Sequence, residues 1–199
     1  MTDIVLGSGS AIRARILTAA GVPFEQIKPD VDEDATKKSA AVAGMTPEQT
    51  AMRLAEEKAL NVCASVSPER LVIGSDQILE FEGALFDKPT SMAAARARLL
   101  EMAGKTHRLI NAVCVARDGA VLWRHIDCPA LHMRAMTERD VDAYLDAAGD
   151  EILYSVGAYQ VEALGARLFE KIDGDYFAVL GLSLYPLIGF LREEGALTF

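Results

Sequence analysis

The sequence predicts an α/β protein with a mixed β-sheet flanked by helices. Short apolar runs, typical of buried strands, alternate with segments whose apolar residues recur at helical spacing, and one long hairpin pattern interrupts this alternation. The chain has 199 residues, 51% of them hydrophobic and 25% charged, which suits one folded domain with a sizeable core. Because no repeat, low-complexity segment or linker divides the chain, we expect a single domain over residues 1–199.

The first half of the chain is predicted to alternate between strands and helices. A first apolar run stops at the small-residue loop Gly7–Ser10 and leads into a helix closed by Gly21. An acidic loop is expected over residues 30–34. Thr46 and Pro47 supply the N-cap and the first position of a second helix. The predicted strands are residues 3–6, 24–28 and 71–73, and the predicted helices are residues 11–20, 46–64 and 91–102.

The second half begins with the hairpin pattern. Asp118-Gly119 separates two β-rich runs, and this dipeptide favours the tight turn of a two-residue hairpin loop. Thr137 and Asp140 occupy positions like those of a capping box, which predicts that a helix begins there. The predicted strands are residues 106–117, 120–134 and 167–172, the predicted helices are residues 137–148 and 183–194, and residues 155–166 are expected to be rich in loops.

Charge and composition restrict the partners. The chain carries 20 Lys and Arg against 29 Asp and Glu, a net charge of −9. A surface this acidic repels phosphate backbones and anionic membranes, so we expect no nucleic-acid or membrane partner. The sequence has neither a signal-peptide pattern nor a long apolar span, which predicts a cytoplasmic protein. The three cysteines are widely spaced and none forms a C-x-x-C motif with another, so neither a zinc site nor a disulfide framework is expected.

The first candidate site is the loop and helix start at Ser8–Arg13. A small-residue loop that joins a strand to a helix presents backbone N–H groups and the positive end of the helix dipole to an anion. Ser8 and Ser10 add hydroxyl groups, and Arg13 adds a guanidinium that can hold a phosphate through two N–H groups. The segment is neither a Walker loop nor a dinucleotide fingerprint. A simpler interpretation, in which Ser10 is only an N-cap and Arg13 a solvated residue, stays open.

Carboxylates and lysines elsewhere could support hydrolysis of a phosphate bond. Asp32 and Glu33 adjoin in the acidic loop, where they could hold Mg²⁺ or form a solvated turn. Asp76 follows a buried strand, where α/β sheets place ligands, and could orient a water, bind a metal or cap a turn. Lys58, late in a predicted helix, and Lys88, in a predicted loop, could bind phosphate or be ordinary surface lysines.

Each of these signals is weak alone, but their order along the chain is specific. The set consists of Ser8-x-Ser10-x-x-Arg13, Val31-Asp32-Glu33, Ala55-x-x-Lys58-Ala59, Gly74-Ser75-Asp76-Gln77, Asp87-Lys88-Pro89, Gly104-x-Thr106-His107, Gly157-Ala158-Tyr159 and Gly174-Asp175-Tyr176 followed by Gly181-Leu182. It closely resembles the Maf family of nucleoside triphosphate pyrophosphatases. The resemblance covers nearly the whole chain, from about residue 4 to residue 194.

The resemblance implies an elongated mixed sheet with two lobes and a central cleft. It also implies hydrolysis of a non-standard, modified or pyrimidine nucleoside triphosphate to the monophosphate and pyrophosphate, with a divalent cation such as Mg²⁺ or Mn²⁺. By match to the family motifs, Asp76 is the proton acceptor, and Glu33 and Asp76 are the catalytic and metal-holding carboxylates. By the same match, the triphosphate is held by Ser8, Ser10, Arg13, Lys58 and Lys88.

The resemblance further implies a base preference. The family positions that govern substrate choice match Ile12, Gln77 and Glu162, and the last two resemble the branch that hydrolyses 7-methyl-GTP. A carboxylate accepts two hydrogen bonds from guanine N1–H and N2–H₂ but only one from uracil N3–H. Ile12 cannot stack on the base as the Trp of that branch does. We therefore expect a modest preference for guanine-type triphosphates.

Two other functions stay open at this point. A nucleotide-sensing regulator of cell division and septum formation would share the phosphate loop but would need neither Asp76 nor Glu33. A general nucleotide hydrolase would release orthophosphate one step at a time instead of pyrophosphate. The expected partner is a nucleoside triphosphate, and the sequence leaves a homodimer open.

Overall fold

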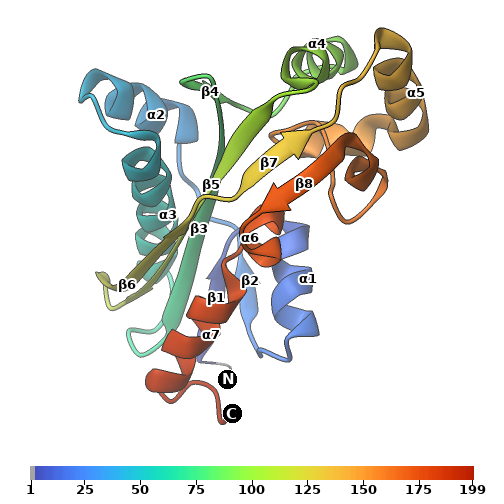
Figure 1. Ribbon diagram of the computed structural model, residues 1–199. Helices are drawn as coiled ribbons and strands as arrows, with labels where there is room; N and C mark the ends of the chain where they lie inside the picture. The colour runs from blue at the N-terminus through green and yellow to red at the C-terminus, as the bar shows by residue number, and fades with distance from the viewer. Residues whose placement is uncertain (1–2) are drawn as a thin grey trace. The chain divides into compact units, whose positions relative to one another are not determined.

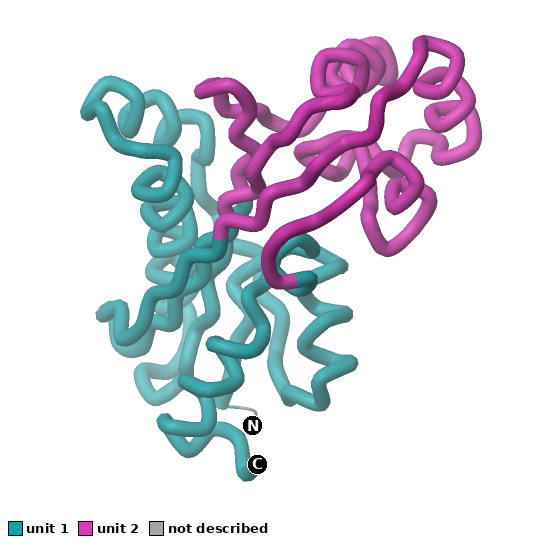
Figure 2. Tube along the Cα trace, in the orientation of Figure 1, with its two compact units in different colours: residues 1–77, 111–127, 176–199 teal, residues 78–110, 128–175 magenta. Residues whose placement is uncertain are grey.

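The computed structural model describes residues 3–199, and these divide into two compact units (Figure 2). The first unit contains the described residues up to Gln77 together with Asn111–Asp127 and Tyr176–Phe199. The second unit contains Ile78–Ile110 and Cys128–Asp175. Both units combine strands with helices, so the predicted α/β class is confirmed (Figure 1). The single domain expected over residues 1–199 stays a prediction.

The strands pair with both parallel and antiparallel neighbours, which confirms the predicted mixed sheet. They are β1 (Ile4–Gly7), β2 (Glu25–Ile27), β3 (Leu71–Phe81), β4 (Ala84–Phe86), β5 (Thr106–Arg117), β6 (Ala120–Asp127), β7 (Ala130–Met133) and β8 (Phe169–Asp173). Their order is β2-β1-β3-β5-β7-β8, with β4 paired to β3 and β6 paired to β5. β1 runs parallel to β2 and β3, whereas the β3–β4, β5–β6, β5–β7 and β7–β8 pairs are antiparallel.

Four of the helices begin directly after capping residues that can be recognised in the sequence. The helices are α1 (Ala11–Ala19), α2 (Glu33–Val42), α3 (Pro47–Cys63), α4 (Met92–Met102), α5 (Glu138–Ala148), α6 (Tyr176–Leu180) and α7 (Leu184–Glu193), with 3₁₀ helices at Gly149–Tyr154 and Leu164–Leu168. Ser10 and Ser91 accept N–H groups of the first turns of α1 and α4. Thr46 and Thr137 complete capping boxes with Gln49 and Asp140.

The first unit is layered, with helices on both faces of its strands (Figure 1). Strand residues of alternate parity, such as Leu6 and Ile73, pack with Leu17 of α1 and Leu187 of α7 in one buried cluster. Residues of the opposite parity point to α3, which contacts β1 and β6. Because successive side chains of a strand point to opposite faces, one face of these strands packs in the core with α1 and α7, and the other faces α3.

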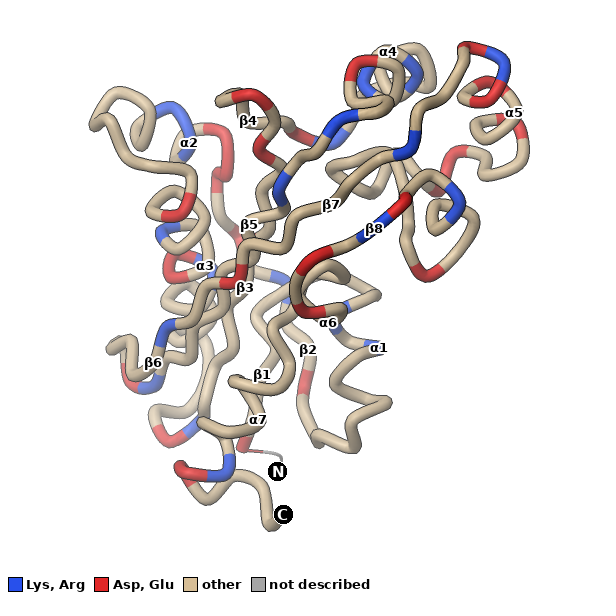
Figure 3. Tube along the Cα trace, viewed as in Figure 1, with Lys and Arg blue, Asp and Glu red and all other residues tan. Residues whose placement is uncertain are grey.

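The second unit is built around the antiparallel pairs of β5, β7 and β8, with α4 and α5 packed together. Arg96 of α4 bridges Glu138 (2.9 Å) and Asp142 (2.5 Å) of α5. Acidic and basic residues are interspersed along the trace of each unit, as Figure 3 shows. No helix among residues 3–199 is long and apolar enough to cross a membrane.

Several predicted boundaries were wrong. Residues 33–34 do not belong to an acidic loop but open helix α2, because Asp32 caps it and two acidic residues in a first turn favour the helix dipole. The strand predicted at residues 71–73 continues to Phe81 as β3. The run at residues 120–134 divides at Cys128-Pro129 into β6 and β7, because proline lacks the N–H that a central ladder needs. β4 and α6 were not predicted.

Candidate active site

Strand β3 carries the residues that organise the candidate site. β1 ends at Gly7, opposite Gly74 of β3, while β3 runs on for several more residues. Asp76 was predicted at the carboxyl end of its strand, but it lies within β3, just beyond the point where the neighbouring strand β1 ends. The space that a sheet end offers to a ligand therefore comes from the end of β1 and its following loop.

The alternation of β3 sends Asp76 to the side of helix α3. Gly74 and Asp76 share this face, and a Cβ added at Gly74 would lie 2.2 Å from Ala55 O and 2.8 Å from Ala59 Cβ. Only glycine fits this close approach of α3 to β3. Lys58 lies between these two alanines in sequence and is directed to the same face, where it is buried.

Lys58 joins two carboxylates from different elements. Its Nζ lies 2.6 Å from Asp76 Oδ1 and 2.8 Å from Glu33 Oε1. Asp76 is 5% exposed and Lys58 6% exposed, whereas the Glu33 side chain is 47% exposed. The structure thus brings together three of the predicted site residues, with the buried pair as the fixed part and Glu33 at the solvent side.

Glu33 reaches Lys58 because α2 is attached firmly to α3. The Asp32 side chain is consumed as the N-cap of α2 and accepts Ala35 N–H at 3.0 Å, so only Glu33 of the acidic pair is available to the site. Thr36 Oγ1 donates to Glu57 Oε2 of α3. Asn61 of α3 exchanges two hydrogen bonds, at 2.9 and 3.1 Å, with the backbone of Asp30 in the loop before α2.

The loop after β1 and the first turn of α1 lie in the same unit. Ser10 caps the helix by accepting Arg13 N–H at 3.5 Å, so the predicted N-cap is confirmed. Ser8 is buried, and its Oγ accepts Ser10 N–H at 3.3 Å. The N–H groups of the first turn have no partner within a helix and point outwards from its N-terminus, which gives this loop the geometry of an anion site.

Arg13 is buried, not solvated. Its Nε donates to Gly181 O (2.7 Å), and its Nη1 donates to Ser75 O (2.9 Å) and Ser8 Oγ (3.1 Å). Burial lowers the pKa of the guanidinium, while the charges of Asp76 and Glu33 raise it. Because Nε and Nη1 already donate to these three oxygens, a hydrogen bond from Arg13 to a phosphate would come from Nη2. A phosphate bound by two different nitrogens, as predicted, would require Arg13 to break one of the existing hydrogen bonds.

No role was predicted for Ser75 or for the turn at Gly181, although both lie in segments that resemble the family. Ser75 points to the face opposite Asp76, where its Oγ donates to Gly181 O at 3.1 Å. Gly181 has φ +103°, a backbone conformation that residues with a side chain rarely adopt. In this conformation its carbonyl oxygen accepts hydrogen bonds from both Ser75 and Arg13. A polar residue at a sheet-buried position of β3 was the signal that could have identified Ser75.

The three predicted specificity residues occupy different surroundings. Gln77 Nε2 donates to Ala178 O (2.9 Å) and Val179 O (3.1 Å), near the end of α6. Ile12 is half-buried and packs against the core cluster that includes Leu17. Glu162 is exposed in the second unit. Their role in base choice stays a prediction.

Lys88 also belongs to the second unit, where it is exposed in the loop after β4. Arg98 anchors this loop by donating to Asp87 O and to Val156 O. Its guanidinium carbon lies 4.9 Å from the centre of the Phe86 ring.

The second unit also contains a buried cluster formed by two of the matched motifs. His107 Nε2 lies 2.5 Å from Tyr159 Oη, and the Tyr159 ring packs edge-on against Phe169 with centroids 4.8 Å apart. His107 Nδ1 is buried without a hydrogen-bond partner in the described chain. Burial lowers the pKa of His107 to about 4, and the nearby His132 contributes in the same direction.

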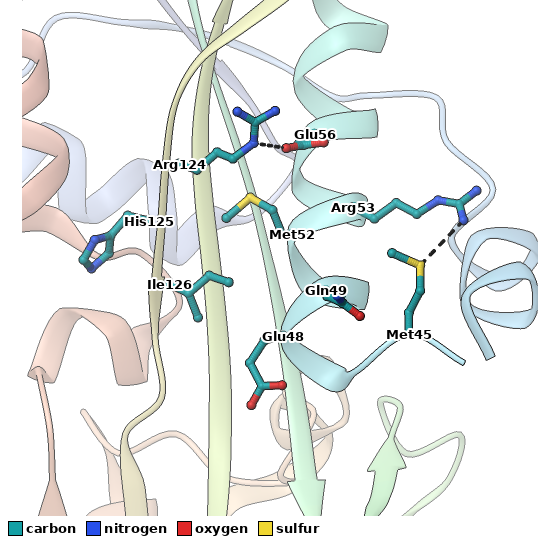
Figure 4. Close-up of a pocket in the computed structure, with 9 residues that line it drawn as sticks. All are labelled: Met45, Glu48, Gln49, Met52, Arg53, Glu56, Arg124, His125 and Ile126. Atoms are coloured by element: carbon teal, nitrogen blue, oxygen red, sulfur yellow. Dashed lines mark hydrogen bonds and ion pairs between the residues drawn. The ribbon is translucent and has the colours of Figure 1, made fainter. Parts of the chain in front are cut away.

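An open pocket of about 690 Å³ in the first unit lies between α3 and β6, away from the residues described above (Figure 4). Met52 and Ile126 give it apolar walls. Its two guanidinium groups already face carboxylates, Arg124 with Glu56 and Arg53 with Glu57.

The donor set fits a hard divalent cation. Among residues 3–199, no group of three or more His, Cys, Asp and Glu side chains is arranged to hold a metal. Mg²⁺ needs only one or two protein carboxylates when phosphate and water complete its shell. Asp76 and Glu33 already converge on one cation, the Lys58 ammonium, which shows that the two carboxylates can share a positive charge.

Known proteins resemble this chain over nearly its whole length. A family model described as Maf-like protein matches residues 3–194. The chain is 47% identical over 198 residues to a protein of Caulobacter vibrioides named nucleoside triphosphate pyrophosphatase, covering 100% of this chain and 98% of that protein. It is 46% identical over 191 residues to a protein of Brucella suis biovar 1 named 7-methyl-GTP pyrophosphatase, covering 96% of each. The chain belongs to the family of Maf-like proteins.

Proposed function

We propose that this chain is a nucleoside triphosphate pyrophosphatase, which cleaves between the α- and β-phosphates to release a nucleoside monophosphate and pyrophosphate. The observation that supports this most directly is the Lys58 ammonium between Asp76 and Glu33, in the unit that also contains the loop after β1. Both named relatives carry pyrophosphatase names and match nearly the whole chain.

The chemistry requires positive charge on the phosphates and a carboxylate near the attacking water. The α1 N-terminus, with Ser8 and Ser10, would bind phosphate oxygens through N–H and O–H groups. Lys58 and Lys88 would neutralise phosphate charge. Arg13 would hold the Ser8 and Ser75 segments in place and face the phosphates through Nη2.

Asp76 would orient the attacking water and accept its proton, because it is fixed in β3 and hydrogen-bonded to Lys58. Glu33 and Asp76 would hold Mg²⁺ or Mn²⁺. When bound, such an ion supplies positive charge to the phosphate oxygens. A buried, pre-positioned set of charges of this kind stabilises the transition state without reorganisation during the reaction.

Product analysis tests the proposed function. Purified protein is incubated with a panel of standard and modified nucleoside triphosphates, including 7-methyl-GTP, UTP and dTTP, and pyrophosphate and orthophosphate are measured separately. We expect pyrophosphate and the monophosphate in equal amounts. Orthophosphate with a diphosphate product would identify a stepwise phosphatase, and no turnover with any triphosphate would favour a nucleotide-sensing regulator.

We further propose that the protein acts in the cytoplasm and that its substrate preference inclines to guanine-type triphosphates. The name of the Brucella relative supports the second point. Binding to nucleic acid or membranes is not expected, since the net charge is −9 and both signs are interspersed in each unit.

A further inference from the structure

We propose that the Lys58 ammonium and a divalent cation are alternative occupants of the space between Asp76 and Glu33, so that Lys58 must leave the carboxylates for a metal to bind. This inference rests on the proposed function, which assigns the same two carboxylates to the metal. It adds that the chain carries its own replaceable cation at that place.

Distances support mutual exclusion. Lys58 Nζ is in hydrogen-bond contact with one oxygen of each carboxylate, at 2.6 Å from Asp76 and 2.8 Å from Glu33. Mg²⁺ binds carboxylate oxygens at about 2.0–2.1 Å and demands near-ideal octahedral geometry. An ion bound to the same Asp76 oxygen would lie within about 5 Å of the ammonium, and two positive charges at that separation repel each other beside the buried Asp76.

Charge balance supports the exchange. The two carboxylates and the Lys58 ammonium carry a net charge of −1, and the Arg13 guanidinium, whose charge interacts with both carboxylates, brings the group to neutral. Without the ammonium the group would carry −1, so a cation between the carboxylates is favoured, whether it is the ammonium or the metal. The ammonium is therefore sufficient to keep two carboxylates together in the absence of metal, but it is not needed once the metal is present. The released ammonium then becomes available to an anion such as a phosphate.

The side chains differ in their freedom to move in a way that suits the exchange. Asp76 is fixed in β3 and nearly fully buried. Lys58 has a flexible four-carbon stem, and Glu33 is about half exposed at the start of α2, which leaves a path for a hydrated ion. Arg13 cannot take this part, because its Nε and Nη1 are bound to backbone carbonyls on two other segments.

The test measures Mn²⁺ binding without nucleotide, from the electron paramagnetic resonance signal of free Mn²⁺. Wild type is compared with Lys58→Met and with Lys28→Met, which removes the same charge from an exposed side chain beside Gly9. We expect Lys58→Met to bind Mn²⁺ at least about tenfold more tightly than wild type, a factor that corresponds to ~1.4 kcal/mol. Lys28→Met should stay within about twofold, since exposed charges are screened.

Three results would overturn the exchange: unchanged or weaker Mn²⁺ binding by Lys58→Met, an equal gain in Lys28→Met, or wild-type Mn²⁺ binding that survives Asp76→Asn. Only the last would also remove the metal site from the proposed function. If Asp76→Asn loses Mn²⁺ while Lys58→Met binds it like wild type, the metal site stands and the exchange does not.

A second measurement does not depend on the folding of Lys58→Met. In ¹⁵N-lysine-labelled wild-type protein, the ammonium resonance of Lys58 is assigned by its absence in Lys58→Arg and followed as Mg²⁺ is added. We expect the resonance to shift or to broaden through faster hydrogen exchange as the ion pairs open. A Lys58 resonance that is unchanged at saturating Mg²⁺ would contradict the proposal.

Discussion

The backbone of Gly74 in β3 lies against the carbonyl oxygen of Ala55 in α3, with no room for a side chain between them. A Cβ at position 74 would come within 2.2 Å of that oxygen. This contact sets the distance between α3 and β3, and with it the reach of Lys58 to Asp76. The absence of a side chain at Gly74 therefore helps to bring Lys58 and Asp76 together in the candidate site.

Gly74→Ala should therefore destabilise the protein and disrupt the site together. We expect the free energy of unfolding to fall by about 3 kcal/mol, because backbone atoms of a helix and a strand must separate. Urea unfolding measures this change. The control is Gly189→Ala in α7, where nothing lies within 4 Å of the added Cβ, and it should be neutral or stabilise by about 0.5–1 kcal/mol.

Removing the charge of Asp76 or of Glu33 should reduce turnover to a similar extent, but only the change at Asp76 should clearly reduce stability. Asp76→Asn and Glu33→Gln should each lower kcat by about 100-fold or more, if both take part in the transition state. Asp76→Asn should also lower the free energy of unfolding by about 1–3 kcal/mol, because it weakens the partner of a buried ammonium. Glu33→Gln, half exposed, should change stability by less than about 0.5 kcal/mol. Wild-type turnover in both variants would contradict the assignment.

Arg13→Lys should lower stability and weaken substrate binding although it keeps the positive charge. Lysine cannot replace the bonds to Gly181 O and Ser75 O with one ammonium, so buried carbonyls lose donors. We expect a loss of about 1–3 kcal/mol in the free energy of unfolding together with a higher KM. Arg15→Lys, on the exposed side of the same helix, is the control and should behave like wild type. A stable Arg13→Lys protein with normal kinetics would show that the network is dispensable.

His107 predicts a pH dependence of stability. Its pKa in the folded protein is about 4, below the ordinary 6.5, so protonation favours the unfolded chain. The stability that this residue contributes is complete above pH 6.5 and is lost as the pH falls towards 4. The loss amounts to about 3 kcal/mol, at ~1.4 kcal/mol per pKa unit.

Urea unfolding of wild type and His107→Gln at pH 7 and pH 4.5 measures this contribution. The variant should lose less stability between the two pH values than wild type. Tyr159→Phe is the control, because it removes the hydrogen-bond partner but leaves the buried imidazole, and it should keep the wild-type pH dependence at a lower overall stability. Parallel behaviour of wild type and His107→Gln would show that His107 does not titrate in this way.

The base preference should depend on Glu162. The wild type is expected to hydrolyse guanine-type triphosphates, including 7-methyl-GTP, with a modestly higher kcat/KM than UTP or dTTP. Glu162→Gln should shift this ranking towards UTP and dTTP, because an amide can pair with uracil or thymine while it loses the double acceptor for guanine. Glu170→Gln, another exposed carboxylate of the second unit, should leave the ranking unchanged. A strong wild-type preference for UTP or dTTP would reject the base assignment but not the reaction.

The sequence alone predicted the α/β class, the main helices and the family. These features depend on neighbouring residues: apolar periodicity, the caps at Ser10, Thr46 and Thr137, and the Asp118-Gly119 turn all act within a few positions of the chain. The order of the motifs was equally readable, because it needs no knowledge of how the chain folds back on itself. The sequence named Lys58 as a candidate, but its position among the buried residues of α3, which indicates that it faces β3, was not used.

Tertiary structure decided what each polar residue does. Asp32 and Glu33 adjoin in sequence, but one caps α2 and the other reaches Lys58. The sequence left Arg13 open as a solvated or a phosphate-facing residue, and the structure excludes the first, because Arg13 is buried against carbonyls from segments far along the chain. The partners of these polar side chains are determined by the packing of α2 on α3, by the alternation of side chains along β3 and by the turn at Gly181. No local pattern records them, because a hydrogen bond between distant segments depends on where both segments are held.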